Sequence, residues 1–407
     1  MATGLELTLL LLAASVFAVV LFRSINLPPM LGYLAVGILI GPHALGLVPD
    51  LRETRYLAEF GVVFLMFSIG LEFSLPKLKS MRRIVFGLGL AQVLATVGSV
   101  MAVGYLVHRY LLDRFDISLA GAFALGGALA MSSTAIVLKL LAERMELETE
   151  HGKRIVGVLL FQDLAVVPLL VIVPALATEP ENIGTALGIA FLKAAALLLL
   201  LLVGGKWLLR RWFYLVARRK SQELFTLNVL LVTLLLAWLT AKAGLSLALG
   251  AFIAGMLISE TEYRHRVEDD IKPFREVLLG LFFVTIGMLL NVRVVVEQFG
   301  WVVLALLLPT GFKFLLIVGL ARLLDAGTGT AIRVALPLAA AGEFGFVLLN
   351  QAGGLSLLPQ EIMQVVLAAM LLSMLATPFL MQYADRIALR FVSSEWMQRA
   401  LALHKIA

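Results

Sequence analysis

The sequence predicts an all-α polytopic membrane protein with thirteen transmembrane helices. Its 407 residues are 61% hydrophobic and only 15% charged, which is typical of an integral membrane protein and not of a soluble one. Apolar stretches long enough to cross a bilayer alternate with charged turns. The N-terminus lacks both a basic segment before the first stretch and a small-residue cleavage site after it, so we expect a first span and not a removed signal.

The apolar stretches follow one another along nearly the whole chain. The second and the ninth are short and rich in glycine, which fits tilted helices or helices covered by their neighbours. The expected spans are 5–22, 28–41, 57–73, 84–108, 118–140, 153–176, 184–209, 222–242, 245–259, 273–290, 299–323, 331–353 and 360–383.

The distribution of Lys and Arg predicts the orientation. Loops after the odd-numbered spans, together with the C-terminal tail, hold 25 of the 33 basic residues. Because basic loops favour the cytoplasmic side, we expect the N-terminus outside and the C-terminus in the cytoplasm. The net charge of +6 gathers on that side and needs no nucleic-acid partner. The chain has no cysteine, and its five histidines fall in expected loops or in the tail, so no thiol chemistry or metal cluster is indicated.

The two halves of the chain resemble each other. The offset of seven spans is odd, so the second half is expected to cross the membrane in the opposite sense. Such inverted repeats are typical of transporters, whose sites lie at the midplane where discontinuous helices meet. Duplication for structure alone is the alternative. The matching positions are Gly32 and Gly37 with Gly250 and Gly255 (a shift of 218), Gly70 with Gly287 (217), and Asp163 and Pro168 with Ser373 and Pro378 (210).

The repeat predicts four parts of the chain. Spans one to six form the first inverted repeat, 1–183, and spans eight to thirteen form the second, 222–385. Span seven lies in a linker, 184–221, and the remaining residues, 386–407, form a cytoplasmic tail.

Asp163 lies about halfway along an otherwise apolar span, next to Gln162. A carboxylate at bilayer depth costs roughly 2.5–3.5 kcal/mol on insertion scales, so chains keep one mainly for function. We interpret it as an ion or proton site, with a buried packing role as the alternative. Lys313 and Glu343 also lie near the midplane. Lys313 is expected to pair with a carboxylate, Asp163 or Glu343, and Glu343 could equally be a structural charge.

Two spans carry small and helix-breaking residues at mid-membrane, within 126–134 and 337–345. This composition predicts locally unwound helices that cross in a core domain. Carbonyl groups released there could coordinate a cation, and the hydroxyls of Ser132, Ser133 and Thr134 could add further ligands. Close helix packing through small residues is the alternative.

These residues resemble the Kef-type potassium/proton antiporters, within the wider monovalent cation/proton antiporter superfamily. The match covers essentially the whole chain. The resemblance implies a core domain that moves against a dimerisation domain, a homodimer in the bacterial inner membrane, potassium at Gln162 and Asp163, and Lys313 as a basic partner. Its most specific segments are 161–163, 131–135, 342–344 and 262–274.

The resemblance also bears on regulation. Glu268, Asp269 and Asp270 look like the family's regulatory loop, although a solvated turn would have the same composition. Family members usually continue into a cytoplasmic nucleotide-binding regulatory domain. The chain ends at Ala407 without a Gly-x-Gly-x-x-Gly unit, so that domain or subunit either lies outside the chain or is lacking.

The predicted function is secondary active transport, not enzymatic catalysis. A monovalent cation exchanges for a proton by alternating access. Gln162 cannot titrate, so the single carboxylate of Asp163 holds one proton or one cation at a time, which predicts electroneutral 1:1 exchange. Potassium as the transported ion rests on the resemblance, and no organic cofactor is expected. The alternatives are a gated potassium channel, a sodium/proton antiporter and a sodium-coupled symporter of organic solutes.

Overall fold

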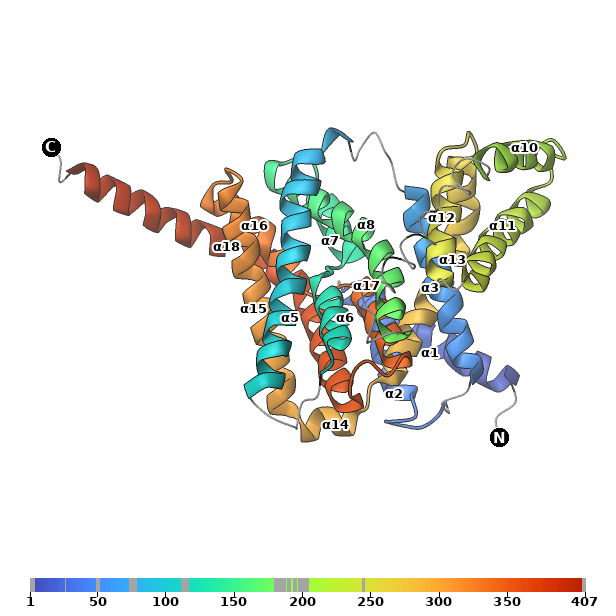
Figure 1. Ribbon diagram of the computed structural model, residues 1–407, viewed down its shortest axis with the longest axis horizontal. Coiled ribbons are helices and arrows are strands. Elements are labelled where there is room, and N and C mark those ends of the chain that lie inside the picture. Colours follow the sequence, from blue (N-terminus) through green and yellow to red (C-terminus); the bar gives the residue numbers. More distant parts are fainter. Residues whose placement is uncertain are drawn as a thin grey trace. The chain divides into compact units, whose positions relative to one another are not determined.

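The computed structural model describes residues 4–25, 27–48, 52–72, 79–110, 117–178, 205–243 and 246–404, together with 188, 192 and 196. All regular secondary structure in these residues is helical (Figure 1). The chain forms two compact units, each assembled from two separate segments. The first unit comprises 1–75 and 167–293, and the second comprises 76–166 and 294–407. Each unit therefore takes helices from both predicted repeats, while the boundaries of the repeats stay a prediction.

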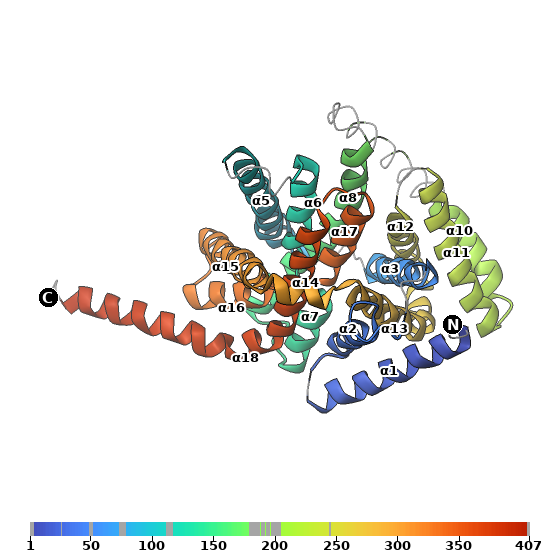
Figure 2. The same cartoon turned by 90° about the horizontal axis from the view of Figure 1, so that it is seen from below.

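The first unit is built from seven helices and the end of an eighth, counting described residues only. The C-terminal part of α8 (Glu150–Thr178) belongs to it, and α14 (Val292–Glu297) lies where the two units join along the chain. In this unit α3 packs against both α12 and α13 (Figure 2). The seven helices are α1 (Gly4–Ser24), α2 (Pro29–Ile40), α3 (Arg52–Glu72), α10 (Lys206–Ala217), α11 (Gln222–Lys242), α12 (Leu247–Ser259) and α13 (Arg264–Leu289).

Four glycines set the packing of the first unit. A Cβ added at Gly37 on α2 would collide with the Val284 carbonyl of α13, and one added at Gly70 on α3 would collide with the Phe252 carbonyl of α12. Gly255 and Gly287 meet the partner backbones in the same way. Only a residue without a side chain allows backbones to approach so closely. The glycines that align between the predicted repeats therefore form two equivalent helix crossings, α2 with α13 and α3 with α12.

The second unit contains the helices that carry the midplane polar residues. It includes a π-helical segment, η1, that leads directly into α5. Its other helices form two broken spans, α6–α7 and α16–α17, and the spans α8, α15 and α18. The elements are η1 (Ile84–Gly89), α5 (Leu90–Tyr110), α6 (Leu119–Ala130), α7 (Thr134–Glu143), the N-terminal part of α8, α15 (Phe299–Leu323), α16 (Thr328–Ala339), α17 (Glu343–Gly354) and α18 (Gln360–His404).

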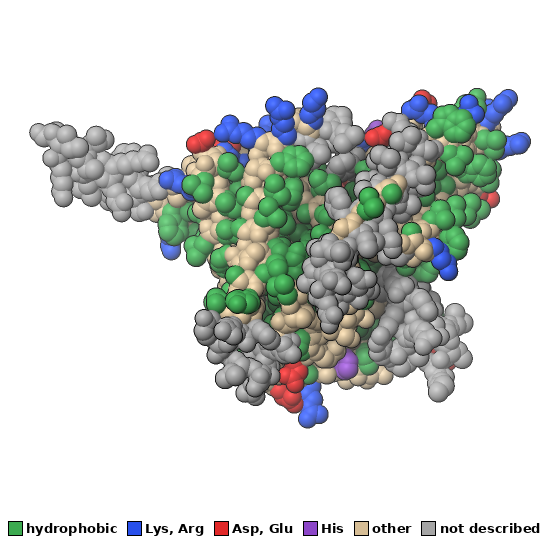
Figure 3. All heavy atoms as spheres, viewed as in Figure 1, with side chains coloured by type: hydrophobic (Ala, Val, Ile, Leu, Met, Phe, Trp, Pro, Cys, Tyr) green, Lys and Arg blue, Asp and Glu red, His purple; other side chains and the backbone are tan. Residues whose placement is uncertain are grey.

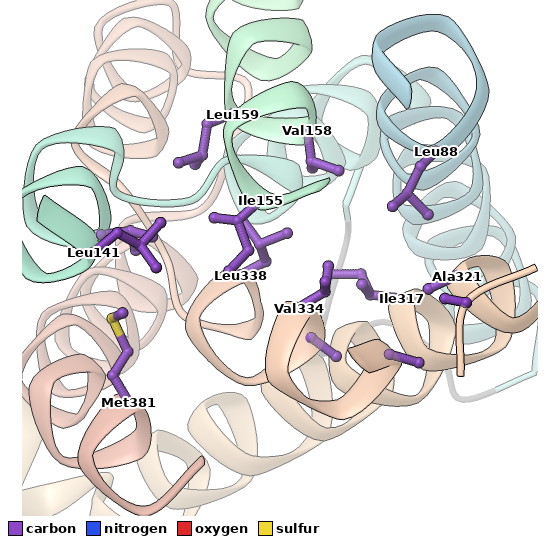
Figure 4. Close-up of a cluster of buried hydrophobic side chains, with 14 residues drawn as sticks. Leu88, Leu141, Ile155, Val158, Leu159, Ile317, Ala321, Val334, Leu338 and Met381 are labelled. Carbon is purple, nitrogen blue, oxygen red and sulfur yellow. The ribbon is translucent and has the colours of Figure 1, made fainter. Parts of the chain in front are cut away.

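A buried apolar cluster ties the second unit together (Figure 4). Leu88 at η1, Leu141 on α7, Ile317 on α15 and Val334 on α16 all belong to it, and each is fully buried. Val158 of α8 joins the same cluster, little more than one turn before Asp163. Close packing of this kind holds the helices that carry the polar residues in fixed positions.

The exposed faces of the second unit are apolar, as a lipid environment requires. Leu307, Leu308 and Leu315 on α15 are among its most exposed large side chains. Hydrophobic side chains cover the visible faces of these helices, and Lys and Arg side chains gather near helix ends (Figure 3). This distribution agrees with a membrane-embedded protein.

The expected spans agree closely with the helices. Within the described residues, six helices are long and apolar enough to cross a membrane, and α16 with α17 forms one further span bent by 42°. The shorter apolar helices Leu9–Ser24, Pro29–Ile40, Phe60–Glu72 and Leu247–Ser259 match four other expected spans, and 273–290 is the C-terminal part of α13. Most of span seven, 184–209, lies outside the described residues. The total of thirteen therefore stays a prediction.

The structure corrects one expectation about local structure and adds detail to another. Glu268, Asp269 and Asp270 lie on α13, which begins at Arg264, and not in a loop. No Gly or Pro lies within 264–272, so nothing in the sequence delays the start of the helix to the apolar stretch. The segment expected as a cytoplasmic tail, 386–407, is helical as far as His404, because α18 continues through it, and its cytoplasmic location stays a prediction. No Gly or Pro interrupts 379–404, so nothing in the sequence ends the helix at the last apolar residue.

Candidate functional site

Two interrupted helices cross in the second unit. Between α6 and α7 the backbone is extended at Met131 and Ser133, and between α16 and α17 it is extended at Ala340 and Gly342. A Cβ added at Gly342 would collide with the Ser132 carbonyl, so the two breaks touch backbone to backbone at this point. The small residues that predicted unwinding therefore lie at the crossing itself.

Lys313 on α15 lies against the C-terminal ends of both interrupted helices. Its side chain is only 2% exposed. Nζ donates hydrogen bonds to the Met131 carbonyl (2.8 Å), the Ser132 hydroxyl (2.9 Å) and the Ala340 carbonyl (3.3 Å). Met131 and Ala340 are the C-caps of α6 and α16, where the helix dipole is negative.

The expectation that Lys313 pairs with a carboxylate was wrong. Its hydrogen-bond acceptors are two backbone carbonyls and one hydroxyl. The physical reason is that a helix break exposes carbonyls without intrahelical partners, and two such ends converge on one ammonium group.

Glu343 occupies the corresponding place at the helix N-termini. It is the first residue of α17 and is 3% exposed. Its Oε1 accepts a hydrogen bond from the Ala135 backbone N–H (3.2 Å), in the first turn of α7. A carboxylate at the positive N-terminal ends of α7 and α17 is stabilised by their dipoles. Glu343 therefore interacts with the N-terminal ends of two helices, and Lys313 interacts with the C-terminal ends of two helices. The two side chains do not form an ion pair with each other in the described residues.

Asp163 lies beside the start of α7. The Thr134 hydroxyl donates a hydrogen bond to Asp163 Oδ1 at 2.9 Å. Thr134 is the first residue of α7, and both side chains are partly buried. A carboxylate and a hydroxyl at a helix start form a site that can hold a proton or a small cation. The sequence analysis placed both residues in the ion site, and the structure brings their side chains into direct contact.

The other predicted ligands have structural partners. The Gln162 amide oxygen accepts the Ser132 backbone N–H (2.8 Å), and the Ser132 hydroxyl donates to the Leu338 carbonyl (2.7 Å). The Ser133 hydroxyl accepts the Ile136 N–H (3.3 Å) and so caps α7. Gln162, Ser132 and Ser133 are almost completely buried. They therefore shape the break, whereas the sequence analysis expected them to bind the ion.

Comparison with known proteins decides the family. The family model of transmembrane sodium/hydrogen exchangers matches residues 10–382. The chain belongs to the sodium/hydrogen exchanger family. Members are ion exchangers, so the expectation of a transporter and not an enzyme is confirmed.

Sequence relatives of the exchanger confirm the Kef-type resemblance. The chain is 44% identical over 389 residues to K(+) efflux antiporter 1 and 42% identical to K(+) efflux antiporter 2, both chloroplastic proteins of Arabidopsis thaliana. It is 41% identical over 394 residues to the putative K(+) efflux antiporter KefB of Alkalimonas amylolytica. These matches cover 94%, 94% and 96% of the chain, but only 32%, 32% and 58% of the relatives. The chain therefore spans about a third to a little over half of their length.

A solved structure shows the fold of the exchanger. The sodium proton antiporter MjNhaP1 from Methanocaldococcus jannaschii, determined at pH 8, matches with a TM-score of 0.70 at 16% sequence identity. The match covers 94% of this chain and 97% of the other. At this identity the similarity establishes the fold alone.

Sequence reasoning missed two residues that hold the helix breaks of the exchanger. Gln92 on α5 is fully buried and accepts a hydrogen bond from Gln162 Nε2 (2.8 Å). Ser373 on α18 accepts the Ala341 backbone N–H (3.0 Å), as Gln162 accepts that of Ser132. The signal for Gln92 is an amide inside an apolar span, but it carries no charge, which is what marks the other core residues in the sequence. Ser373 was noted only as the repeat equivalent of Asp163.

The acidic residues once expected in a regulatory loop belong to the first unit. Asp270 accepts hydrogen bonds from the Gln222 amide and the Thr226 hydroxyl, both at 3.4 Å, so it joins the start of α11 to α13. Asp269 is exposed and Glu268 is partly exposed. Their regulatory role stays a prediction. Within the described residues, no three His, Cys, Asp or Glu side chains come together to hold a metal ion.

Proposed function

We propose that this exchanger moves potassium and protons in opposite directions by alternating access, with Asp163 carrying one proton or one cation in each half-cycle. The observation that carries the proposal is the pairing of Asp163 with the Thr134 hydroxyl (2.9 Å) next to two crossed helix breaks. Lys313 and Glu343 are committed to helix ends. Asp163 is the least enclosed of the three core charges, because its side chain is only partly buried whereas Lys313 and Glu343 are almost fully buried.

Coupling follows from the cost of moving a bare carboxylate. With a proton or a monovalent cation bound, Asp163 is neutral or nearly so, and the conformational change can proceed. Without either, the charge would enter a low-dielectric barrier at a cost of several kcal/mol. The neighbour of Asp163 is Gln162, which carries no proton to exchange. One carboxylate thus supports electroneutral 1:1 exchange.

The ligands proposed for the cation are fewer than the sequence suggested. Asp163 and Thr134 supply a carboxylate and a hydroxyl oxygen. The Gln162 amide oxygen is already engaged by the Ser132 N–H, so we assign it to the scaffold. Potassium as the cargo is supported by the names of the relatives, which are K(+) efflux antiporters. Sodium is the competing cargo, because the structurally similar MjNhaP1 is a sodium proton antiporter.

The decisive experiment uses purified protein in liposomes, with a pH-sensitive dye in the lumen and an outward-directed potassium gradient. Valinomycin is added to hold the membrane voltage at the potassium equilibrium potential. A channel then adds nothing to the existing potassium conductance, whereas an exchanger still acidifies the lumen faster than protein-free vesicles do. Equal rates with and without protein would refute exchange. Repeating the assay with sodium, rubidium and lithium ranks the cargo ions.

Asp163→Asn is expected to abolish this acidification, because an amide can neither release a proton nor neutralise a cation. Asp325→Asn is the matched control, since Asp325 forms an exposed ion pair with Arg83 (3.5 Å) away from the helix breaks. Wild-type rates in Asp163→Asn, with expression unchanged, would refute the site. Loss of activity in both variants would point to a general defect instead.

We also propose a homodimer in a bacterial inner membrane, with the N-terminus outside and a nucleotide-binding regulatory domain or subunit on the cytoplasmic side. The distribution of basic residues supports the orientation. Because the chain has no cysteine, single substitutions such as His43→Cys and Arg390→Cys report it through an impermeant thiol reagent. His43→Cys should be labelled from outside intact cells and Arg390→Cys should not. Labelling of Arg390→Cys from outside would contradict the proposed orientation.

A further inference from the structure

A chain of buried side-chain amides crosses the second unit behind the ion site. Gln92 on α5 and Gln162 on α8 are both 0% exposed. Gln162 Nε2 donates to Gln92 Oε1 at 2.8 Å. Gln92 Nε2 donates to the Ala130 carbonyl (3.1 Å) and to the Thr96 hydroxyl (3.2 Å). With the bond from the Ser132 N–H to Gln162 Oε1 (2.8 Å), this chain links three segments of the unit.

The two ends of this chain lie on opposite sides of the same helix break. Ala130 is the last residue of α6, and its carbonyl belongs to the helix end that lacks intrahelical donors. Ser132 lies in the extended segment that follows, and its N–H has no place in either helix. The two glutamines therefore satisfy a backbone acceptor and a backbone donor that unwinding releases. Left unpaired in a buried site, each would cost on the order of 1–3 kcal/mol.

The order of donors and acceptors allows only one arrangement of the two amides. The Ser132 N–H can only donate, so Gln162 must turn its oxygen toward it and its NH2 group toward Gln92. Gln92 must then turn its oxygen toward Gln162 and its NH2 group toward the Ala130 carbonyl, which can only accept. Neither amide can flip without losing two bonds. Gln162 is thereby held in one orientation next to Asp163.

Packing on the neighbouring turn fixes α8 at the same level. A Cβ added at Gly89, the last residue of π-helical η1, would lie 2.5 Å from Phe161 Cβ. Phe86 packs edge-on against Phe161, with ring centroids 6.1 Å apart. The π-helical segment leads directly into the turn that carries Gln92, and π-helical segments are frequent at functional sites.

We propose that Gln92 is a positioning residue of the ion site. It acts through Gln162 and the Ser132 backbone to set where α7 begins, and thus to hold the Thr134 hydroxyl beside Asp163. Gln92 itself touches neither Asp163 nor Thr134 through any hydrogen bond seen in the described residues. This inference rests on the proposed exchange at Asp163. It adds Gln92 as a determinant of the affinity of the Asp163 site for cations.

The test compares Gln92→Met with the wild type in the liposome assay. Methionine keeps the length of the side chain but provides no amide. The apparent KM for potassium is expected to rise about tenfold, the factor that about 1.4 kcal/mol represents, and the pH profile of exchange to shift with it. Gln92→Asn, whose amide falls short of its partners, should give the same direction of change if Gln92→Met does not fold. Unchanged KM and pH profile in the folded variant would overturn the inference.

Two further measurements separate this inference from the proposed function. Thr233→Val is the matched control, because Thr233 is equally buried and bonds only the Val229 carbonyl of its own helix in the first unit. It should leave both KM and pH profile unchanged. A thermal-unfolding cycle of Gln92→Met, Gln162→Met and the double variant should show strongly non-additive losses. Additive losses would disprove the coupling between Gln92 and Gln162, and this result does not depend on transport by the wild type. Absence of exchange in the wild type would refute only the proposed function.

Discussion

At the scale of single residues, the core of the exchanger places two charges at helix ends and leaves a third, the proposed ion carrier Asp163, only partly buried. Lys313 and Glu343 are both almost fully buried, and both contact backbone groups at helix termini. Asp163 accepts a hydrogen bond from the Thr134 hydroxyl and is only partly buried. A charge enclosed at helix ends is held by fixed dipoles, whereas a partly exposed carboxylate can be reached by an ion or a proton.

The first residue-level prediction concerns pH. Protons and potassium compete for the Asp163 carboxylate, so the apparent KM for potassium should rise as pH falls, at most about tenfold per pH unit. The maximum rate should change much less over the same range. The measurement is the initial rate of lumen pH change at several potassium concentrations and at three pH values. A KM that is independent of pH would mean that the two ions use different sites.

The second residue-level prediction concerns stability. Lys313→Met should lower the melting temperature of the purified protein by several degrees, because the Met131 and Ala340 carbonyls lose a charged donor. Hydrogen bonds to a charged group contribute about 1.5–3 kcal/mol each, partly offset by the removal of a buried charge. Lys139→Met is the control, since Lys139 is half exposed and pairs only with Glu143 (3.7 Å). Equal melting temperatures for both variants would contradict the assigned role.

At the scale of helices, the site depends on two breaks that touch. Neither α6–α7 nor α16–α17 could offer backbone carbonyls and N–H groups at mid-membrane if it were continuous. Each break is held by a side chain from a neighbouring helix: Gln162 of α8 binds the Ser132 N–H, and Ser373 of α18 binds the Ala341 N–H. The similarity of these two arrangements is what an inverted repeat would produce.

The prediction at this scale is a steric one. Gly342→Ala should lower both melting temperature and exchange rate, because the new methyl group would push the Ser132 backbone away at the crossing. Overpacking of this kind costs typically about 1–3 kcal/mol. Gly319→Ala on α15 is the matched control, since nothing lies within 4 Å of a Cβ added there. It should keep activity and gain slightly in stability from its better helix propensity. A functional Gly342→Ala protein with an unchanged melting temperature would contradict the close crossing.

At the scale of the whole molecule, each compact unit combines helices from both halves of the sequence. Every residue assigned here to the ion site, including Gln92, belongs to the second unit. The first unit carries the glycine-mediated crossings of α2 with α13 and α3 with α12. This division agrees with a transport core and a separate scaffold, which the resemblance to Kef-type antiporters implies.

The whole-molecule prediction is electroneutrality. Reconstituted wild-type protein should give no sustained current on a solid-supported membrane after a jump in potassium or pH, although the lumen dye reports proton flux under the same gradients. Gln162→Asp adds a second carboxylate and is expected to make transport produce current. A sustained current from the wild type would exclude 1:1 exchange. A Gln162→Asp variant that transports without producing current would contradict the claim that the number of carboxylates at positions 162 and 163 sets the charge moved per cycle.

The sequence by itself determined where the apolar helices lie and which polar residues they bury. Apolar length and charge placement reflect partition between water and lipid, which each segment obeys almost independently. For that reason the expected spans coincide with helices wherever the structure describes them, and Asp163, Lys313 and Glu343 were recognised. The interruptions at 131–133 and 340–342 were also predictable, from small and helix-breaking residues.

Only the tertiary structure decided which group each polar residue meets. Lys313 binds a carbonyl 182 positions away, and Glu343 accepts an N–H from 208 positions away. Such pairings depend on how the helices cross, and no local pattern in the sequence contains that information. The partner expected for Lys313 was therefore wrong, Gln92 was missed, and the bond between Gln162 and the Ser132 N–H was not foreseen. Backbone groups released at a helix break are invisible in a list of side chains, yet they compete for every buried donor and acceptor nearby.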